Sequence, residues 1–427
     1  MLDLETIRTR TDEVRRNTAD RNVQADIDKV LALADQRSAL IQEADALRNR
    51  RNEVSQRTSK ASEPERTALI EEGKRLKAQI AEKEQALAAV EEDLRAEQGR
   101  IPNLTHPDAP VGKDESANRE LRRWGAPPQF PFKPRDHVAI AEEMDLVDFE
   151  AGTKVTGANF FFLKNEAVLL ELALCRFALD ILREEGFTLH TTPDLARLRV
   201  LEGTGFNPRG EETQIYRIEG QDLGLIATAE ITLGGLLMDE ILPAERLPIL
   251  AAGLSHCFRV EAGAYGRASR GLYRVHQFTK VEMFAFTRPE ESDRMHDRFL
   301  AIEERIYQAL GIPYRVVDIA TGDLGGPAYR KFDLEAWMPG RGEGGEWGEI
   351  TSTSNCTDYQ ARRLGIRYRP GPGKKPELVH TLNGTAIATS RTLIAVLENY
   401  QQADGSVRVP EVLRPIAGFE RIAPRRG

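Results

Sequence analysis

The chain has 427 residues, of which 41% are hydrophobic and 30% charged, and its formal net charge at pH 7 is −8. No run approaches the ~20 apolar residues that a membrane span needs, and the N-terminus lacks the basic and apolar segments of a signal peptide. Cys175, Cys257 and Cys356 form no Cys-x-x-Cys pair, which argues against a disulfide framework and a zinc site. We therefore predict a cytoplasmic protein of about two domains, in which any nucleic acid would bind to local basic patches.

The first hundred residues have the composition of long helices, with Pro64 as their single proline. Apolar residues recur there at a spacing of seven along two stretches. The first stretch has Leu33, Leu40, Leu47, Val54 and Ala61, and the second has two rows, Leu69, Leu76 and Val90, and Ile80, Leu87 and Leu94. Two heptad helices of this kind pair as an antiparallel coiled coil, which we predict over about residues 27–100.

The turn of this coiled coil is predicted near Ser59 to Pro64. Ser62 followed by Glu65 has the spacing of a capping box, which would begin the second helix. At 1.5 Å per residue, helices of about 33 residues would form an arm of ~50 Å. A shorter helix is predicted around Leu4 to Asn17, at the base of this arm.

Basic residues gather in the half of the coiled coil nearer its tip. They are Arg48, Arg50, Arg51, Arg57, Lys60, Lys74, Arg75 and Lys77. Charges at exposed coiled-coil positions usually provide solvation and register. The alternative is that the basic tip binds a phosphate backbone through charge, with little reading of bases.

A proline-rich connector runs from Ile101 to Gly125, and we predict one domain over residues 1–108 and another over residues 109–427. In the second domain, helical patterns over Asn165–Glu185 and Arg288–Leu310 alternate irregularly with strands. This mixture predicts an α+β fold with a mainly antiparallel sheet flanked by helices. Neither a Rossmann glycine fingerprint nor a P-loop is present, so a bound nucleotide is expected in another kind of site.

Two extended runs, His256 to Glu261 and Leu272 to Phe286, flank a glycine-containing loop and predict an antiparallel hairpin. Side chains alternate between the two faces of a strand. On the first run, Arg259 and Glu261 share a face. On the second run, one face has Arg274, His276, Phe278, Lys280 and Glu282, and the other includes Val275, Val281, Met283 and Ala285. The polar face either lines a polar site or is the solvated surface of an ordinary sheet.

These residues carry a resemblance to a known family. Phe258-Arg259-Val260-Glu261, Tyr265-Gly266-Arg267, Arg270-Gly271-Leu272 and the run from His276 to Glu282 resemble motif 2 of the class II aminoacyl-tRNA synthetases, in its seryl-tRNA synthetase version. Four other segments extend the resemblance over essentially the whole chain, arm included. They are Thr192 to Gly205 (motif 1), Thr228-Ala229-Glu230, the run from Gly322 to Cys356 including Lys331 to Trp337 and Glu349 to Ser352, and Asn383 to Tyr400 (motif 3).

The match departs from the family pattern in motif 1 and before Thr228, and Thr351 and Thr353 are small variations on the usual Ser-rich run. In motif 1, Thr192 stands where a proline is expected, and Phe206-Asn207 is an unusual continuation. Ala227 likewise replaces the proline expected before Thr228. The departures in motif 1 concern the segment that forms the dimer interface in the family, so details of that interface are left open.

The resemblance implies roles for individual residues. Arg259 is implied to bring together the ATP α-phosphate and the amino-acid carboxylate, since a planar guanidinium suits two oxyanions. Glu261 would accept a hydrogen bond from the adenine amino group, Phe278 would stack on the base, and Arg391 would cover it and contact the γ-phosphate. The whole implied ATP-binding set is Arg259, Val260, Glu261, Val275, Phe278, Glu349, Ile350, Thr351, Ser352 and Arg391. The loop residues Arg267 and Arg270 are candidates for contacts to the triphosphate or the tRNA acceptor end, although a plain surface role for Arg270 is equally open.

Serine is implied to bind to Thr228, Glu230, Arg259, Glu282 and Thr385, with the Thr-x-Glu element around its ammonium group. Glu349 and Ser352 are implied to hold Mg²⁺ on the ATP phosphates, as hard oxygen ligands for a hard cation. The catalytic residues expected from the resemblance are Arg259, Glu349 and Arg391. No zinc is expected.

The family resemblance implies a homodimer that attaches L-serine to tRNA(Ser) with ATP through a seryl-adenylate, the arm lying along the long variable arm of the tRNA. Whether a selenocysteine-inserting tRNA is also charged stays open. One alternative is an enzyme of the same fold that loads an amino acid onto a carrier protein, and another is an inactive coiled-coil interaction protein. Prolyl or threonyl specificity is a further alternative, since the adenylate chemistry is common to the class.

Overall fold

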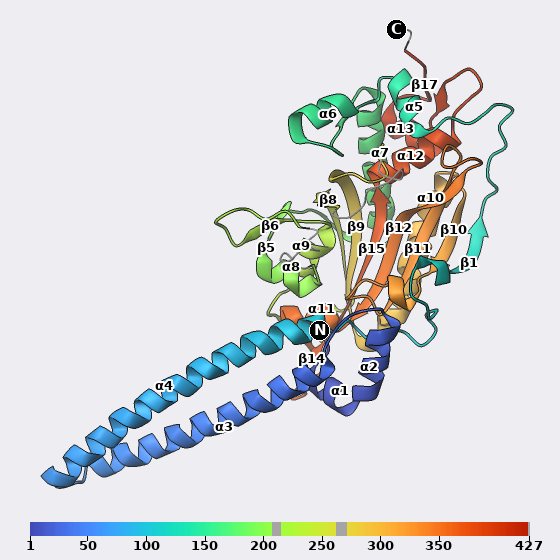
Figure 1. Ribbon diagram of the computed structural model, residues 1–427. Helices are drawn as coiled ribbons and strands as arrows, with labels where there is room; N and C mark the ends of the chain where they lie inside the picture. Colours follow the sequence, from blue (N-terminus) through green and yellow to red (C-terminus); the bar gives the residue numbers. More distant parts are fainter. Residues whose placement is uncertain (207–214, 262–270, 426–427) are drawn as a thin grey trace. The chain divides into compact units, whose positions relative to one another are not determined.

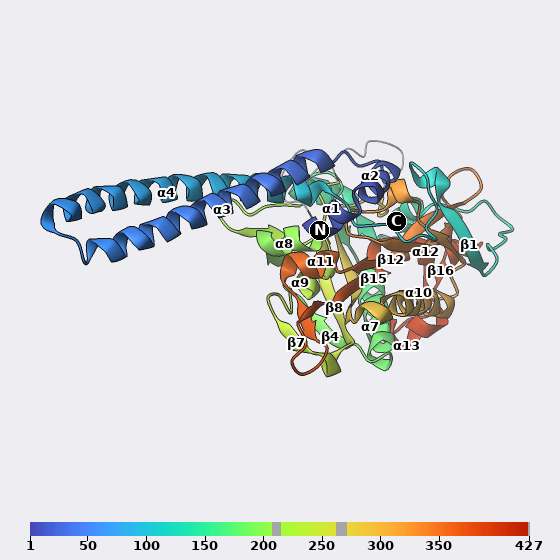
Figure 2. The ribbon, with the colours of Figure 1, turned by 90° about the horizontal axis from the view of Figure 1, so that it is seen from below.

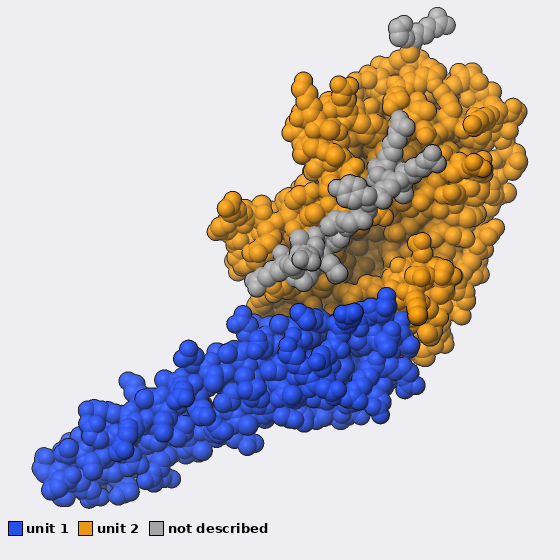
Figure 3. All heavy atoms as spheres, viewed as in Figure 1, with its two compact units in different colours: residues 1–104 blue, residues 105–427 orange. Residues whose placement is uncertain are grey.

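The structure is a computed structural model that describes residues 1–206, 215–261 and 271–425. The chain divides into two compact units, Met1–Leu104 and Thr105–Gly427 (Figure 3). Within the described ranges, no helix is both long and apolar enough to span a bilayer.

The first unit is entirely helical. It consists of α1 (Leu4–Thr9), α2 (Thr11–Asp20), α3 (Ile27–Thr58) and α4 (Glu63–Arg100). Figures 1 and 2 both show α3 and α4 side by side along their length, as the heptad pattern predicts. The turn between them falls at residues 59–62, within the predicted stretch. The shorter helix predicted before the arm is instead two helices, because the chain leaves helical geometry at Arg10.

The predicted heptad residues form the seam of the arm. Leu40 and Val54 of α3 and Leu69 and Leu76 of α4 are buried. Lys83 interrupts the apolar rows of α4, and its ammonium group forms an ion pair of 2.7 Å with Glu43 of α3. Further cross-helix pairs join Arg37 to Glu91, Arg48 to Glu84 and Lys29 to Glu97. The charged residues thus fix the register of helices whose seam is apolar.

The predicted capping box at the start of α4 is wrong. Ser62 is the N-cap residue, but its side chain makes no capping hydrogen bond. Glu65 does not reach back to the cap; its carboxylate lies 3.3 Å from Arg57, across the turn. An ion pair between the two helices has taken the place of the local motif.

The second unit is built on an eight-stranded sheet, which confirms the α+β prediction (Figure 1). Its order is β1 (Arg119–Trp124), β10 (Tyr314–Asp318), β11 (Arg330–Met338), β12 (Glu346–Thr357), β15 (His380–Ala388), β9 (Gln277–Thr287), β8 (Ile249–Phe258) and β4 (Thr188–Thr191). Every pairing is antiparallel except that of β4 with β8. Strand β9 of the predicted hairpin thus pairs with β8 on one side and with β15, the strand predicted for motif 3, on the other.

Two cores cover the two sides of this sheet. The larger packs Val281, Met283 and Ala285 of β9 against α7 (Glu166–Glu184), α10 (Ser292–Ala309) and α12 (Thr389–Asn399). The smaller packs Phe284 and Phe286 against α9 (Ala229–Gly234) and α11 (Tyr359–Leu364).

The remaining α-helices of this unit are α5 (His137–Glu143), α6 (Phe149–Thr156), α8 (Leu198–Thr204) and α13 (Arg414–Ala417). The remaining strands are β2 (Val147–Asp148), β3 (Phe162–Leu163), β5 (Leu195–Arg197), β6 (Leu223–Leu225), β7 (Ile241–Pro243), β13 (Arg367–Arg369), β14 (Glu377–Leu378), β16 (Val407–Arg408) and β17 (Arg421–Ile422).

Helix α7 lies where it is predicted, and it leaves two apolar side chains uncovered. Leu169 and Leu172 are 47% and 61% exposed. Leu170 and Leu174 of the same helix are buried. Apolar residues surround much of this helix, so its sequence alone did not decide which side would face the sheet.

The predicted hairpin is shorter than expected. Strand β8 ends at Phe258 and β9 begins at Gln277, so Arg259 and Glu261 lie beyond the ladder. One further backbone hydrogen bond, from Arg259 N to His276 O at 2.9 Å, extends the pairing. Glu261 then has a φ of +51°, a left-handed conformation that ends the extended run. Arg267 and Arg270 fall in the stretch 262–270, outside the described residues.

Candidate active site

An open pocket, whose empty space of about 450 Å³ includes open solvent, is lined by residues of β9, β12 and β15 and of the segments beside them. Its lining includes nine of the residues expected from the sequence, namely Arg259, Glu261, Val275, Phe278, Glu349, Ile350, Thr351, Thr385 and Arg391. Tyr273, Arg274, Lys280, Ala388 and Ser390 complete it. Residues as far apart in the sequence as Arg259 and Arg391 are thus brought to one place by the order of the strands.

Two of these residues contribute less through their side chains than the sequence suggests. Ile350 packs in the larger core. The hydroxyl of Thr351 donates to Glu303 Oε2 of α10 at 3.0 Å. Burial raises the pKa of Glu303 well above its ordinary value.

Two arginines line the cavity, and they differ in whether a carboxylate neutralises their charge. Arg391, in the first turn of α12, pairs with Glu349 Oε1 at 3.0 Å and donates to the Glu349 carbonyl at 3.1 Å. Arg259 makes only a 3.4 Å contact from Nε to the Ala227 carbonyl, and its guanidinium lies 5.4 Å from the centre of the Phe278 ring. Among the described residues, no carboxylate pairs with Arg259. Its charge is therefore available to an anionic ligand.

The adenine-binding residues implied by the resemblance also lie at this cavity. Glu261 Oε2 is 3.4 Å from Arg274, its partner in this structure. Tyr273 lies beneath two cations, with its ring centre 4.3 Å from the Arg341 guanidinium and 4.8 Å from that of Arg391. The sequence analysis assigned no role to Tyr273. A single aromatic residue beside the polar face of the strand does not by itself indicate a binding role.

The residues implied for serine binding form a buried polar group beside the cavity. Glu282 Oε2 pairs with Lys280 Nζ at 2.5 Å and accepts from the Thr385 hydroxyl at 3.2 Å. Both charged side chains are almost fully buried, and a buried charge needs such a partner. The parity of β9 placed Lys280 on the correct face, and the structure adds that it neutralises Glu282.

Glu230 lies at the start of α9, where Thr228 is the N-cap and its hydroxyl accepts from the Glu230 N–H at 3.2 Å. Glu230 Oε1 accepts from Gln360 Nε2 at 2.7 Å and from Asn383 Nδ2 at 3.0 Å. Burial, and then the charge of Glu282, raises the pKa of Glu230 from 4.5 to about 7. Sequence reasoning missed Gln360, because nothing in its local pattern indicates a contact 130 residues away.

The candidate Mg²⁺ ligands lie at the junction of β11 and β12. Ser352 is paired in register with Asp333, whose Oδ1 is buried and, within the part of the chain that the structure describes, accepts no hydrogen bond. Burial opposes ionisation of Glu349, but Arg391 and Lys331 outweigh it and lower its pKa from 4.5 to about 2. An ionised carboxylate, a hydroxyl and an unsatisfied carboxyl oxygen are the hard donors that Mg²⁺ prefers, so the residues present fit this ion.

Comparisons with known proteins agree with this geometry. Residues 1–105 match the seryl-tRNA synthetase N-terminal domain, and residues 214–400 match the class II tRNA synthetase core domain (G, H, P, S and T). The chain is 62% identical to the serine–tRNA ligase of Rubrobacter xylanophilus over 100% of both chains, and 56% identical to that of Treponema denticola over 99% of this chain and 100% of the relative.

Solved structures show the same relationship. Seryl-tRNA synthetase from Pyrococcus horikoshii, complexed with ATP, superposes with a TM-score of 0.89 at 41% identity over 100% of both chains. Cytoplasmic serine–tRNA ligase from Naegleria fowleri, in complex with AMP, gives 0.82 at 34% identity over 97% of this chain and 96% of that one. The chain therefore belongs to the seryl-tRNA synthetase family of class II aminoacyl-tRNA synthetases.

Proposed function

We propose that the protein attaches L-serine to tRNA(Ser) in the cytoplasm, with ATP and through a seryl-adenylate. The observation that carries the proposal is one cavity in which Arg259, Arg391 and Glu349 meet, with the Glu230 and Glu282 carboxyl groups buried beside it. Cationic side chains suit a triphosphate, and buried carboxyl groups suit an ammonium ion and a hydroxyl. The names of the relatives support the same reaction.

In the first step, a serine carboxylate oxygen attacks the α-phosphorus of ATP. The bond between the α-phosphorus and the oxygen that bridges it to the β-phosphorus breaks, and pyrophosphate leaves. Arg259 holds the two reacting anions together and neutralises the charge that develops between them. In the second step, a terminal ribose hydroxyl of the tRNA attacks the seryl carbonyl and AMP leaves. Neither step needs a covalent bond to the enzyme.

Mg²⁺, when bound with ATP, would neutralise charge on the triphosphate, and Glu349 and Ser352 would hold it. The low pKa of Glu349 keeps this ligand ionised throughout the physiological range. The Arg391–Glu349 pair orients the ligand before ATP arrives.

Recognition of serine is proposed to depend on Glu282 and Thr385 for the hydroxyl and on Thr228 and Glu230 for the ammonium group. A buried site that hydrogen-bonds a hydroxyl leaves its own groups unpaired with alanine, and so rejects it strongly. Threonine would be rejected by lack of space. No contact in the described residues favours a carrier protein, an inactive scaffold, or proline as substrate.

We propose that residues 1–108 bind the tRNA and that residues 109–427 catalyse both steps. The support is the charge at the arm tip. Arg48, Arg50 and Arg57 are tied in ion pairs. Arg51, Lys60, Arg66, Arg75 and Lys77 are exposed and, among the described residues, pair with no carboxylate. Such unpaired cations are available to phosphates.

Reversing three of these charges, in the variant Arg51→Glu/Lys60→Glu/Arg75→Glu, is expected to lower kcat/KM for tRNA charging by about 100-fold or more, since each lost phosphate contact removes favourable charge. Serine-dependent ATP–pyrophosphate exchange should stay within twofold. The control is Arg95→Glu, an exposed change of the same sign near the base of α4. Equal loss of charging in both variants, or loss of exchange, would contradict a specific role for the tip.

We also propose a homodimer formed through α7 and β4. Leu169 and Leu172 expose apolar side chains on α7, and Leu189 does so on β4, an end strand of the sheet. Such a patch beside an open strand edge suits a second copy of the chain. Sedimentation analysis is expected to give a dimer for the wild type and a folded monomer for Leu169→Glu/Leu172→Glu. A variant that remains dimeric would place the interface elsewhere.

A further inference from the structure

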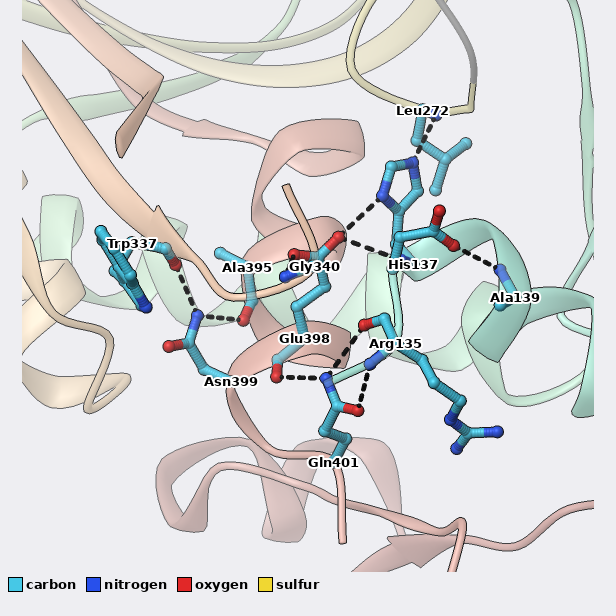
Figure 4. Close-up of polar contacts among 11 residues, drawn as sticks. Arg135, His137, Ala139, Leu272, Trp337, Gly340, Ala395, Glu398, Asn399 and Gln401 are labelled. Carbon is cyan, nitrogen blue, oxygen red and sulfur yellow. Dashed lines mark hydrogen bonds and ion pairs between the residues drawn. The ribbon is translucent and has the colours of Figure 1, made fainter. Parts of the chain in front are cut away.

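A buried histidine links three segments on one side of the cavity (Figure 4). His137 is the first residue of α5, and its ring lies between Glu398 of α12 and the backbone of Leu272. Its Nδ1 is 2.9 Å from Glu398 Oε1, and its Nε2 accepts from the Leu272 N–H at 3.1 Å. His137 and Glu398 are both buried. No residue of this group is assigned a role in the proposed reaction.

The contacts determine which tautomer of the His137 ring is present. Because the Leu272 N–H can only donate, Nε2 must be the unprotonated nitrogen, and Nδ1 carries the hydrogen that Glu398 accepts. Glu398 also accepts from the backbone N–H groups of His137 and Gly340, both at 2.9 Å. The carboxylate thus orients the histidine through both its ring and its backbone.

Leu272 leads directly into the lining of the cavity. The next residue is Tyr273, whose carbonyl accepts from Arg391 Nε at 3.4 Å and whose ring lies 4.8 Å from the Arg391 guanidinium. Arg391 and Glu398 belong to the same helix, α12. The contacts therefore form a closed loop. Glu398 of α12 binds His137, His137 binds the backbone of Leu272, and Tyr273 contacts Arg391 of α12.

Gly271 shows how closely the ring approaches this segment. Its φ is +86°, and a Cβ built there would lie 2.2 Å from His137 Nε2. A side chain at this position would meet the ring nitrogen that accepts from Leu272. The segment and the histidine can be this close only because residue 271 is glycine.

We propose that His137 is a positioning residue for ATP, which sets Tyr273 and Arg391 at their mutual distance through the Leu272 N–H. The inference rests on the proposed function, in which Arg391 contacts the nucleotide. The serine-binding group is held by different partners, since Gln360 and Asn383 support Glu230, and Lys280 supports Glu282. Loss of the histidine should therefore affect ATP and leave serine binding intact.

The test compares His137→Asn and His137→Gln in the full-length protein by serine-dependent ATP–pyrophosphate exchange. Asparagine can reach Glu398 from the position of Nδ1 but cannot reach Leu272, whereas glutamine can place an acceptor near the position of Nε2. His137→Asn is expected to raise KM for ATP about tenfold, as expected for one buried hydrogen bond, with KM for serine within twofold. His137→Gln should restore at least half of the loss.

The matched control is Asn399→Ala, the neighbouring residue on α12. Its side chain donates to Trp337 O and Ala395 O, both at 2.8 Å, and has no link to Leu272. This variant should leave KM for ATP unchanged even where it lowers the melting temperature. If His137→Asn does not fold, Gly271→Ala provides the second test, and the same selective rise in KM for ATP is expected.

An unchanged KM for ATP in His137→Asn, or equal rises for ATP and serine, would overturn the inference while the wild type still exchanges. Absence of serine-dependent exchange in the wild type would instead overturn the proposed function.

Discussion

Replacing Arg259 with alanine is expected to lower kcat/KM for serine-dependent ATP–pyrophosphate exchange by about 10³-fold, the typical cost of removing a preorganised charge from a developing anion. The reason is its free charge. Arg391 is already matched by Glu349 at 3.0 Å. The guanidinium of Arg259, by contrast, has among the described residues a long contact to Ala227 and an aromatic ring beside it, and no carboxylate partner. Its interaction energy is thus available to the substrate anions.

The variant Arg259→Lys tests whether the positive charge alone or the planar shape of the guanidinium accounts for the role of Arg259. Lysine keeps the cation but lacks the planar pair of donors that two oxyanions require together, so we expect most of the loss to remain. Arg305→Ala is the control, because this arginine pairs on the surface with Glu184 and Glu185, away from the cavity. Near-normal exchange in Arg259→Lys would show that simple charge, without bridging, accounts for its role.

Replacing Glu230 with glutamine is expected to raise KM for serine about 100-fold or more, since a buried charge-assisted contact to the ammonium group is lost. Glutamine has the same shape, and its oxygen can still accept from Gln360 and Asn383, the partners of Glu230 Oε1. Binding of ATP should therefore change little. Steady-state kinetics with each substrate varied in turn will separate the two effects.

The same residue gives the reaction a pH dependence. Burial raises the pKa of Glu230 from 4.5 to about 7, and the ionised form is the one that binds the serine ammonium group. KM for serine should therefore rise as pH falls from 8 to 6, by about tenfold for a group with this pKa, and Glu230→Gln should remove this dependence. A dependence that persists in the variant would assign the titration to another group.

The same pKa shift predicts that Glu230 lowers the stability of the folded protein at the pH values where it favours serine binding. A carboxyl whose pKa is higher in the folded state destabilises that state as pH rises from 4.5 towards 7, and the full cost is present above about 7. Glu230→Gln has no such cost, so its melting temperature at pH 8 is expected to exceed that of the wild type. The gain should shrink as the pH approaches 5. Loss of function with a gain in stability would mark Glu230 as a binding residue.

The sequence predicts those features that depend on local periodicity. The heptads of α3 and α4 are long and regular, so the arm, its seam and its turn follow from spacing alone. The parity of β9 placed Phe278, Lys280 and Glu282 on one face, and the structure brings all three to the site. In both cases, the pattern that forms the element also selects its buried or functional side.

The errors concern features that distant residues decide. Ser62 has the spacing of a capping box, but the other helix supplies Arg57 as a partner for Glu65. Gln360 holds Glu230 through the fold alone. None of these outcomes is encoded within a window of a few residues.

The most direct test of the account is serine-dependent ATP–pyrophosphate exchange by the purified wild-type protein, with alanine, threonine and proline as competitors. We predict exchange with serine, and weak or no competition from the other three amino acids. Exchange that depends on one of those amino acids would preserve the fold and overturn the substrate. Absence of exchange with every amino acid would contradict the catalytic account as a whole.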